Sequence, residues 1–176
     1  MENSTGNAGD IAIKTNSLLA KDGVIIGTRT SGKGKGGNLS IDAQDVQLTN
    51  KSSLLAFSGE NSTGDVGDIT IQTNSLLDKE REINGNGSSG KGNGGDLTIK
   101  TNTLLAKDSV IIDVDTNGEG NGGNLSIDAQ DVQLTSDSRL FTSSGESSTG
   151  DLGNLMIKTN NLLVKDSTSE DRSGHG

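Results

Sequence analysis

The sequence of 176 residues contains no cysteine, proline, tryptophan or tyrosine. Without cysteine, it has neither a disulfide framework nor a thiolate metal site. The single histidine, His175, stands next to the last residue, which argues against Ser-His-Asp, Cys-His and multi-histidine chemistry. Aromatic residues make up 1% of the chain, so a conventional aromatic core is excluded as well.

Positive charge is also scarce, with 15 basic against 24 acidic residues and a net charge of −9. Nucleic acids and anionic membranes attract basic surfaces, so neither is expected as a partner. Apolar runs are only a few residues long, whereas a membrane helix needs about 20. Residues 1–10 show no features of a signal peptide, so we expect no export signal in this chain.

What the chain does contain is an internal repeat. The pattern Gly-[Asp/Asn]-[Ile/Leu]-x-Ile occurs six times at spacings of 28 or 30 residues, starting at Gly9, Gly37, Gly67, Gly95, Gly123 and Gly153. Residues 37–49 and 123–135 are identical, so a block of three units is duplicated at an offset of 86 residues. A period of this length is typical of solenoid proteins. We number the units one to six from these glycines.

Each unit predicts three short strands and one polar loop. Residues 10–15, 45–49 and 24–28 exemplify the three strands; the first two show the two-residue alternation of a strand buried on one face. Stacking the units aligns apolar residues of the first strand into a ladder of Ile13, Ile41, Ile71, Ile99, Ile127 and Ile157. The sequence therefore predicts an all-β parallel β-helix with about six coils of 28–30 residues.

The outward positions agree with this register. Stacking places Lys14 beside Asp42, and Lys100, Asp128 and Lys158 in a row, which gives exposed opposite-charge neighbours. A further column consists of amides, for which we expect either a hydrogen-bonded ladder or ordinary corner chemistry: Asn16, Gln44, Asn74, Asn102, Gln130 and Asn160. Phe57 and Phe141 are expected at one equivalent outward position.

Unit three departs from the pattern, because Asp78, Glu82 and Asn84 stand where other units have apolar or small residues. Either the strand slips by one residue around Ile83 or this side of the coil bulges. For the whole chain we expect the tail of a preceding repeat in residues 1–8, one β-helical domain in residues 9–166, and a polar, disordered tail in residues 167–176. The isolated chain is then expected to associate end to end or to fray at its terminal coils.

Two motifs suggest ligands. Residues 27–33 and 85–91 fit G-x-x-x-x-G-K, but neither is followed by the Ser or Thr and the helix that a phosphate-binding loop requires. Residues 113–118 match the opening of a calcium loop, in which Asp113, Asp115 and Asn117 would supply oxygens. The twelfth position is Asn124 rather than glutamate, so a solvated loop is the favoured interpretation. We expect no catalytic, cofactor or metal residue.

The unit G-[DN]-[IL]-x-I-x-T-N-x-L-L-x-K-D-x-x-I, closing in GxGNGG and seen best at residues 95–122, resembles the repeats of large bacterial exoproteins of the filamentous-haemagglutinin-like type. The resemblance covers residues 9–166. It implies a right-handed parallel β-helix, two-partner secretion and an extracellular or cell-surface location. The secretion domain of that family carries an Asn-Pro motif, which this proline-free chain lacks.

The leading functional hypothesis is therefore a structural shaft segment of an adhesin-like surface protein. A binding module, whose loops or strand face contact glycan, calcium or another chain, is the alternative. An enzyme is not expected, since most acidic residues lie in loops or alternate with lysines along the strands.

Overall fold

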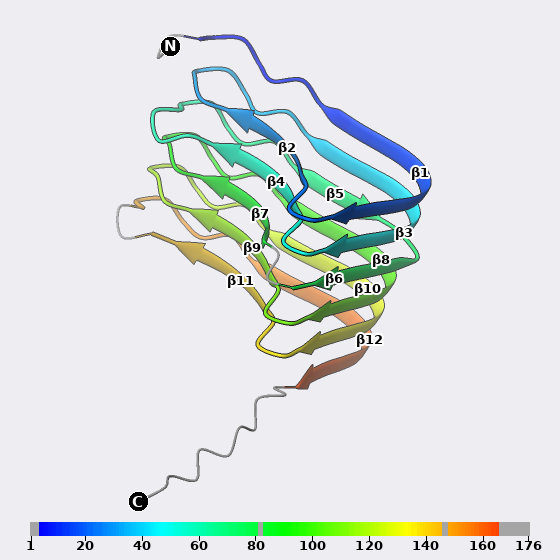
Figure 1. The fold of residues 1–176 in the computed structure, drawn as a ribbon. Coiled ribbons are helices and arrows are strands. Elements are labelled where there is room, and N and C mark those ends of the chain that lie inside the picture. The colour runs from blue at the N-terminus through cyan, green and yellow to red at the C-terminus, as the bar shows by residue number, and fades with distance from the viewer. Residues whose placement is uncertain (1–3, 81–82, 146–147, 166–176) are drawn as a thin grey trace, which may run out of the picture.

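The computed structural model describes residues 4–80, 83–145 and 148–165, and every regular element in these ranges is a β-strand. The strands form two parallel sheets (Figure 1). The first sheet contains β1 (Ile11–Lys21), β3 (Leu39–Thr49), β5 (Ile69–Gln72), β6 (Ser75–Lys79), β8 (Leu97–Lys107), β10 (Leu125–Thr135) and β12 (Leu155–Lys165). The second contains β2 (Ile25–Thr30), β4 (Ser53–Ser58), β7 (Ile83–Ser88), β9 (Ile111–Thr116) and β11 (Arg139–Ser144).

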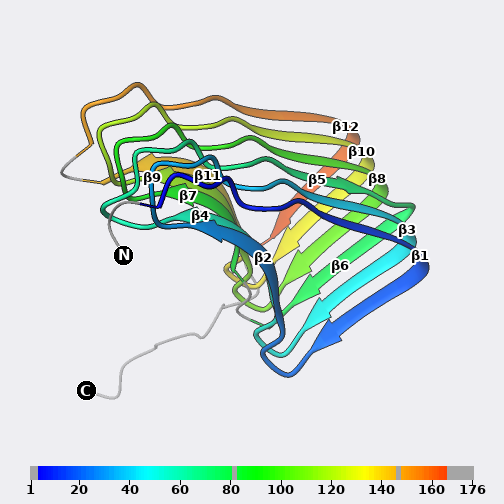
Figure 2. The same cartoon turned by 90° about the horizontal axis from the view of Figure 1, so that it is seen from above.

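The strands stack in repeat order, so the chain is a β-solenoid of about five turns. Within each sheet, every strand pairs with the equivalent strand of the next unit in parallel, as in the pairing of Ile13 with Ile41. Figure 2 shows the long strands along one side and the short strands along another, with the polar loops closing the third side. The predicted all-β parallel fold is thus confirmed.

The three strands expected for each unit are two in most of the molecule. The first two predicted strands form one continuous strand of 11 residues that bends in the middle. In β3 the bend is visible as two successive exposed residues, Gln44 and Asp45, after which the alternation of buried and exposed residues resumes. Only unit three separates the two segments, as β5 and β6. Backbone pairing continues around the corner elsewhere because neighbouring coils bend at the same residue.

The predicted apolar ladders form the core. Ile41, Ile71, Ile99 and Ile127 are each 1% exposed, and the neighbouring ladders are buried in the same way in units two to five. Leu54 of β4 and Ile112 of β9, on the short strands, face the same interior. A row of hydroxyl side chains that sequence reasoning missed closes the interior at the ends of the short strands: Thr30, Ser58, Ser88 and Thr116. Among these, Thr30 and Ser88 donate hydrogen bonds to the carbonyl oxygens of Gly34 and Gly92.

Unit three keeps its register, so of the two alternatives the strand slip around Ile83 is wrong; the bulge would fall at residues 81–82, which lie outside the described residues. Ile83 pairs with Ile111 and Gly85 pairs with Leu55, the positions that the other units predict. Asp78 is fully buried at the interior position that Ala106 occupies one unit later. Asn86 is also buried, and its amide donates to the carbonyl oxygens of Gly67 and Asp96. Glu82 lies outside the described residues, as do the terminal segments 1–3 and 166–176.

The loop side of each coil is held by glycines that touch one another. A Cβ added to Gly37 would overlap the carbonyl oxygen of Gly9 in the coil before it, and the same is true at the first glycine of units three to six. A second glycine column behaves in the same way: a Cβ added to Gly64 would overlap the carbonyl oxygen of Gly34, and the contact repeats along the stack as far as Gly150 and Gly120. Neighbouring coils approach more closely here than any side chain allows, which is why these positions are glycine.

Two ladders of aspartate and asparagine side chains accompany the glycines. In the first, the side-chain Oδ1 in units one to five accepts a hydrogen bond from the backbone N–H of the next unit's equivalent residue, at 2.7–2.9 Å. Its members are Asp10, Asn38, Asp68, Asp96, Asn124 and Asn154. The second ladder includes Asp65, Asn93, Asn121 and Asp151. The Gly-[Asp/Asn] pair of the repeat is therefore a device that joins coils.

The outward charge pairs are partly as predicted. Lys14 contacts Asp42 at 3.0 Å and Lys158 contacts Asp128 at 3.3 Å. Lys100 forms no ion pair with Asp128 among the described residues, and Asp128 pairs with Lys158 on its other side. The amide column from Asn16 to Asn160 also forms no side-chain ladder among its six described members, and there the coils are joined by backbone bonds such as Asn74 N–H to the Gln44 carbonyl.

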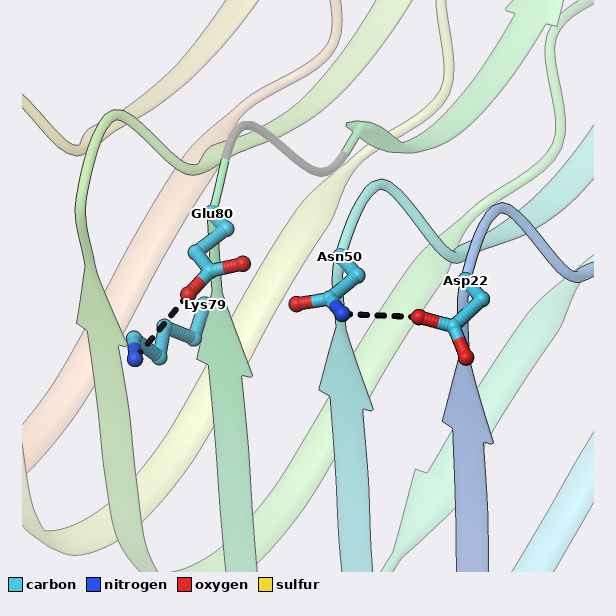
Figure 3. Close-up of polar contacts among 4 residues, drawn as sticks. All are labelled: Asp22, Asn50, Lys79 and Glu80. Atoms are coloured by element: carbon cyan, nitrogen blue, oxygen red, sulfur yellow. Dashed lines mark hydrogen bonds and ion pairs between the residues drawn. The ribbon is translucent and has the colours of Figure 1, made fainter.

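The corners after β1, β3, β6, β8 and β10 are tight turns with left-handed backbone conformations. Asp22 has a φ of 64° and Glu80 a φ of 77°, and every non-glycine residue with positive φ in the described ranges lies at one of these corners. Figure 3 shows two contacts there: Asn50 donates to Asp22 at 2.7 Å, and Lys79 forms an ion pair with Glu80 at 3.0 Å. The contact with Glu80 raises the pKa of Lys79.

Candidate functional site

The outer face of the second sheet carries the two aspartates singled out by the sequence. Alternation along β9 points Ile112 and Val114 into the core and directs Asp113 and Asp115 outward, in adjacent positions on one face. Pairing across the sheet defines two rows of outward residues. The first is Gly27, Leu55, Gly85, Asp113 and Phe141, and the second is Arg29, Phe57, Gly87, Asp115 and Ser143.

These rows enclose a hollow of about 210 Å³ over β7. Gly85 and Gly87 have no side chains and form its floor. Leu55 and Phe57 from β4 form an apolar wall, and the two carboxylates from β9 form the opposite wall. A Cβ at Gly87 would overlap Oδ1 of Asp115, so this carboxylate leans over the glycine. The Arg29 guanidinium lies 5.6 Å from the centre of the Phe57 ring, at the rim of the apolar wall.

Partial burial makes the two carboxyl groups harder to ionise. Desolvation, and secondarily the charge of Asp115, raise the pKa of Asp113 to about 6. Desolvation also raises the pKa of Asp115, while a hydrogen bond from the Asn117 amide opposes the shift. That bond joins Asn117 Nδ2 to Asp115 Oδ2 at 2.8 Å. Two neighbouring carboxyl groups with raised pKa values in a hollow are a recognised feature of binding and catalytic sites.

The structure does not place the DVDTNG motif in a calcium loop. Residues 111–116 form strand β9, so Asp113 and Asp115 are held in an extended conformation within the sheet. Asn117 directs its amide nitrogen, rather than an oxygen, toward Asp115. The expectation of a solvated loop at Asp113 and Asp115 is therefore wrong. No group of three or more His, Cys, Asp or Glu side chains suited to a metal ion occurs within the described ranges.

The two phenylalanines do not share an equivalent position, contrary to expectation. Phe57 pairs with Gly87 in the second row, whereas Phe141 pairs with Asp113 in the first, two residues away along the strand. The offset of 86 residues would have shown this, because Phe57 corresponds to Ser143 and Phe141 corresponds to Leu55. Both rings are partly exposed on the same face, and they lie on opposite sides of the acidic pair.

A second concave surface runs along the bend of the long strands. This open groove of about 810 Å³ crosses units one to five and is lined by charged, hydroxyl and amide side chains. Its members include Lys14, Asp42, Gln72, Lys100 and Asp128, at successive steps of the solenoid. Lysine and aspartate alternate with one glutamine between them, so the groove presents both charges to a ligand.

The G-x-x-x-x-G-K segments do not form phosphate loops. Their first residues lie in β2 and β7, and strands rather than helices follow each in the structure.

Comparison with known proteins found no matching family model, no matching curated protein and no matching solved structure. Among the described residues, no helix is long and apolar enough to cross a membrane.

Proposed function

We propose that this chain is a structural β-solenoid shaft segment of an adhesin-like surface or secreted protein. The observation that supports this most directly is the continuity of the ladders through all six units. The isoleucine core, the first glycine column and the first Asp/Asn ladder each run from unit one to unit six. The resemblance of the repeat to filamentous-haemagglutinin-like exoproteins supports an extracellular or cell-surface location.

A shaft acts by setting a distance, and the ladders provide one. Each unit adds one strand spacing of about 4.8 Å along the stacking direction. The row Ala12, Ser40, Thr70, Thr98, Ser126 and Met156 marks these steps on one outward face of the long sheet. Spacing requires no specific outward side chain, so the outer surface is free to vary while the core and loop columns are retained.

The absence of cysteine allows a direct test of rigidity. In doubly labelled protein diluted with an excess of unlabelled chain, so that contacts between copies do not contribute, spin labels on Ala12→Cys and Met156→Cys should be separated by five strand steps, or about 24 Å between backbones before the label arms are added. A shaft gives a narrow distribution that is unchanged when Lys14, Asp42 and Asp128 are all replaced by alanine. A broad distance distribution in the labelled protein that keeps Lys14, Asp42 and Asp128 would contradict the proposal.

The role itself can be tested in a display assay. The chain is placed between a membrane anchor and a small reporter domain, with one or two copies of the 86-residue block. Reporter access to a bulky antibody should rise with copy number, and the Lys14, Asp42 and Asp128 replacements should not change it. If Ile99→Asp, which disrupts the core, leaves access unchanged, an ordered shaft is not required.

The alternative function is a binding module, which the polar groove and the acidic hollow favour. The groove offers both charges in register along five units, and this could accommodate a long polar chain such as a glycan. A glycan array and pull-down from surface extracts, performed with the wild type and the triple alanine variant, separate the two functions. Saturable binding that the variant loses would replace the shaft proposal with the binding module.

A further inference from the structure

The first and last strands of the long sheet leave complementary edges uncovered. β1 and β12 lie at opposite ends of the stack, and among the described residues each has a strand on one side only (Figure 1). Leu155, Leu162 and Val164 of β12 are 41%, 52% and 66% exposed, whereas the equivalent Ile69 and Leu76 inside the stack are 0% and 4% exposed. β1 likewise leaves Ile11, Ile13 and Leu18 only half-buried.

We propose that these two edges bind each other between copies of this chain, so that β12 of one copy pairs in parallel with β1 of the next. The argument rests on the duplication of 86 residues. Unit six corresponds to unit three, and unit one corresponds to unit four. The interface between units three and four, which pairs β5 and β6 with β8, already exists within the molecule. The contact between copies repeats that interface.

Each apolar contact of the interface between units three and four has an equivalent in the contact between copies. The internal pairs Ile71–Ile99 and Leu76–Leu104 become Ile157–Ile13 and Leu162–Leu18 between copies. The internal pair of Asp78 with Ala106 becomes Val164 with Ala20, which replaces a carboxylate by an apolar side chain. The contact between copies is therefore more apolar than its template.

The hydrogen-bonded ladders also end in complementary groups. At the β12 end, Oδ1 of Asp151 and of Asn154 accepts no hydrogen bond from the described residues. At the other end, the backbone N–H groups of Asn7 and Asp10 donate none within that same part of the chain. Inside the stack, the equivalent bonds run from Asn93 to Asp65 at 2.9 Å and from Asp96 to Asp68 at 2.8 Å. Stacking of two copies completes both ladders.

One feature opposes this contact. Lys158 and Lys14 become neighbours between copies, where the internal template has Gln72 beside Lys100. Each copy also carries a net charge of −9. Both repulsions are screened by salt, so association should strengthen as ionic strength rises. The contact joins two different edges and repeats the stacking step of the solenoid, so copies add along one axis and form open-ended filaments.

Sedimentation velocity of the full chain over a range of concentrations tests the proposal. We expect a series of species that grows with concentration and with salt, and linear filaments in electron micrographs. Lys158→Gln reproduces the Gln72–Lys100 pair of the internal interface. It should lower, by several-fold, the protein concentration at which the larger species form. A chain that stays monomeric at all concentrations and salt levels would overturn the proposal.

A glycine variant separates assembly from folding. A Cβ at Gly6 or Gly9 meets nothing within 4 Å in the single chain, but between copies it would overlap a glycine carbonyl oxygen of the neighbouring copy. Gly6→Ala/Gly9→Ala should therefore keep the wild-type circular dichroism and melting temperature and lose assembly. Gly59→Ala, at a glycine away from both edges whose Cβ would have its nearest atom 3.8 Å away, is the matched control and should assemble normally. Undiminished assembly of the Gly6/Gly9 variant would refute the stacking.

Cysteine crosslinking fixes the register independently of stability. Ala12 and Met156 become direct neighbours between copies, at about the backbone distance that a disulfide spans, but lie five steps apart within one chain. Oxidised Ala12→Cys/Met156→Cys protein should give a ladder of multimers on a non-reducing gel. Ala12→Cys/Ser126→Cys, one step out of register, should not. Multimers from both, or dimers from Ala12→Cys alone as the main product, would contradict the head-to-tail arrangement.

Discussion

Replacing Ile99 by aspartate tests the stacked interior most severely. Ile99 is 1% exposed and lies between Ile71 and Ile127 in the ladder. Loss of a buried isoleucine side chain costs about 2–5 kcal/mol. An unpaired buried carboxylate adds several kcal/mol, or must take up a proton to avoid that cost. The total is at least about 5 kcal/mol, which is comparable to the whole stability of a typical domain.

The neighbouring residue provides the control. Lys100 points outward and forms no ion pair within the described ranges, so Lys100→Asp changes only the surface next to Asp128. A like-charge neighbour across strands costs about 0.2–1 kcal/mol. Urea unfolding followed by circular dichroism should therefore show a small shift for Lys100→Asp, and loss of most β structure for Ile99→Asp before urea is added. Similar midpoints for the two variants would refute the register of the core.

Three other perturbations test the loop columns and the acidic hollow. Gly123→Ala forces a Cβ onto the Gly95 carbonyl oxygen and disturbs the nearby Asn124–Asp96 hydrogen bond. It should therefore destabilise the fold by about 2 kcal/mol or more, measured by thermal melting. A melting temperature equal to that of Gly59→Ala would contradict the close approach of coils. The folded-state pKa of Asp113, about 6, lies above that of the unfolded chain, so its stabilising contribution is complete below about pH 4 and is lost as pH rises through 6. Asp113→Asn should then raise the melting temperature at pH 7.5 but hardly at pH 4, and a gain of equal size at both pH values would disprove a titrating Asp113. We also predict no specific calcium requirement, measured as equal melting temperatures with calcium and with chelator; a calcium-dependent rise that Asp113→Ala abolishes would overturn this.

Much of the architecture could be predicted because the sequence contains six copies of one repeat unit, which can be aligned with one another. Period, alternation and stacking together fixed the buried ladder from Ile13 to Ile157, and the structure places these residues inside. The fusion of the first two strands was missed because alternation alone does not show whether pairing continues through a corner. The slip in unit three was suggested by composition, but the pairing of Ile83 with Ile111 shows that neighbouring coils hold the register instead.

The candidate site was less predictable. The aspartates of DVDTNG were found as a motif, yet their setting depends on Gly85 and Gly87 one unit earlier in the sequence. A search within single motifs does not reveal a hollow made by residues 28 apart. Aligning the units would have shown both the glycine floor and the different rows of Phe57 and Phe141. The same alignment would have revealed the hydroxyl row, because positions 30, 58, 88, 116 and 144 are all Ser or Thr.

Comparison of the six units within this chain shows what each position requires. The first glycine of the motif and the isoleucine four residues later are the same in every unit, whereas the residue after that isoleucine is lysine, aspartate or glutamine. The interior itself is less strict, because unit three accepts the buried polar residues Asp78 and Asn86. Unit three nevertheless keeps its glycines in both glycine columns, and Asp68 in the first Asp/Asn ladder. The glycine columns and the first Asp/Asn ladder thus continue through unit three, where the strands keep their register, while the outer face of β7 carries the glycines of the hollow beside Asp113.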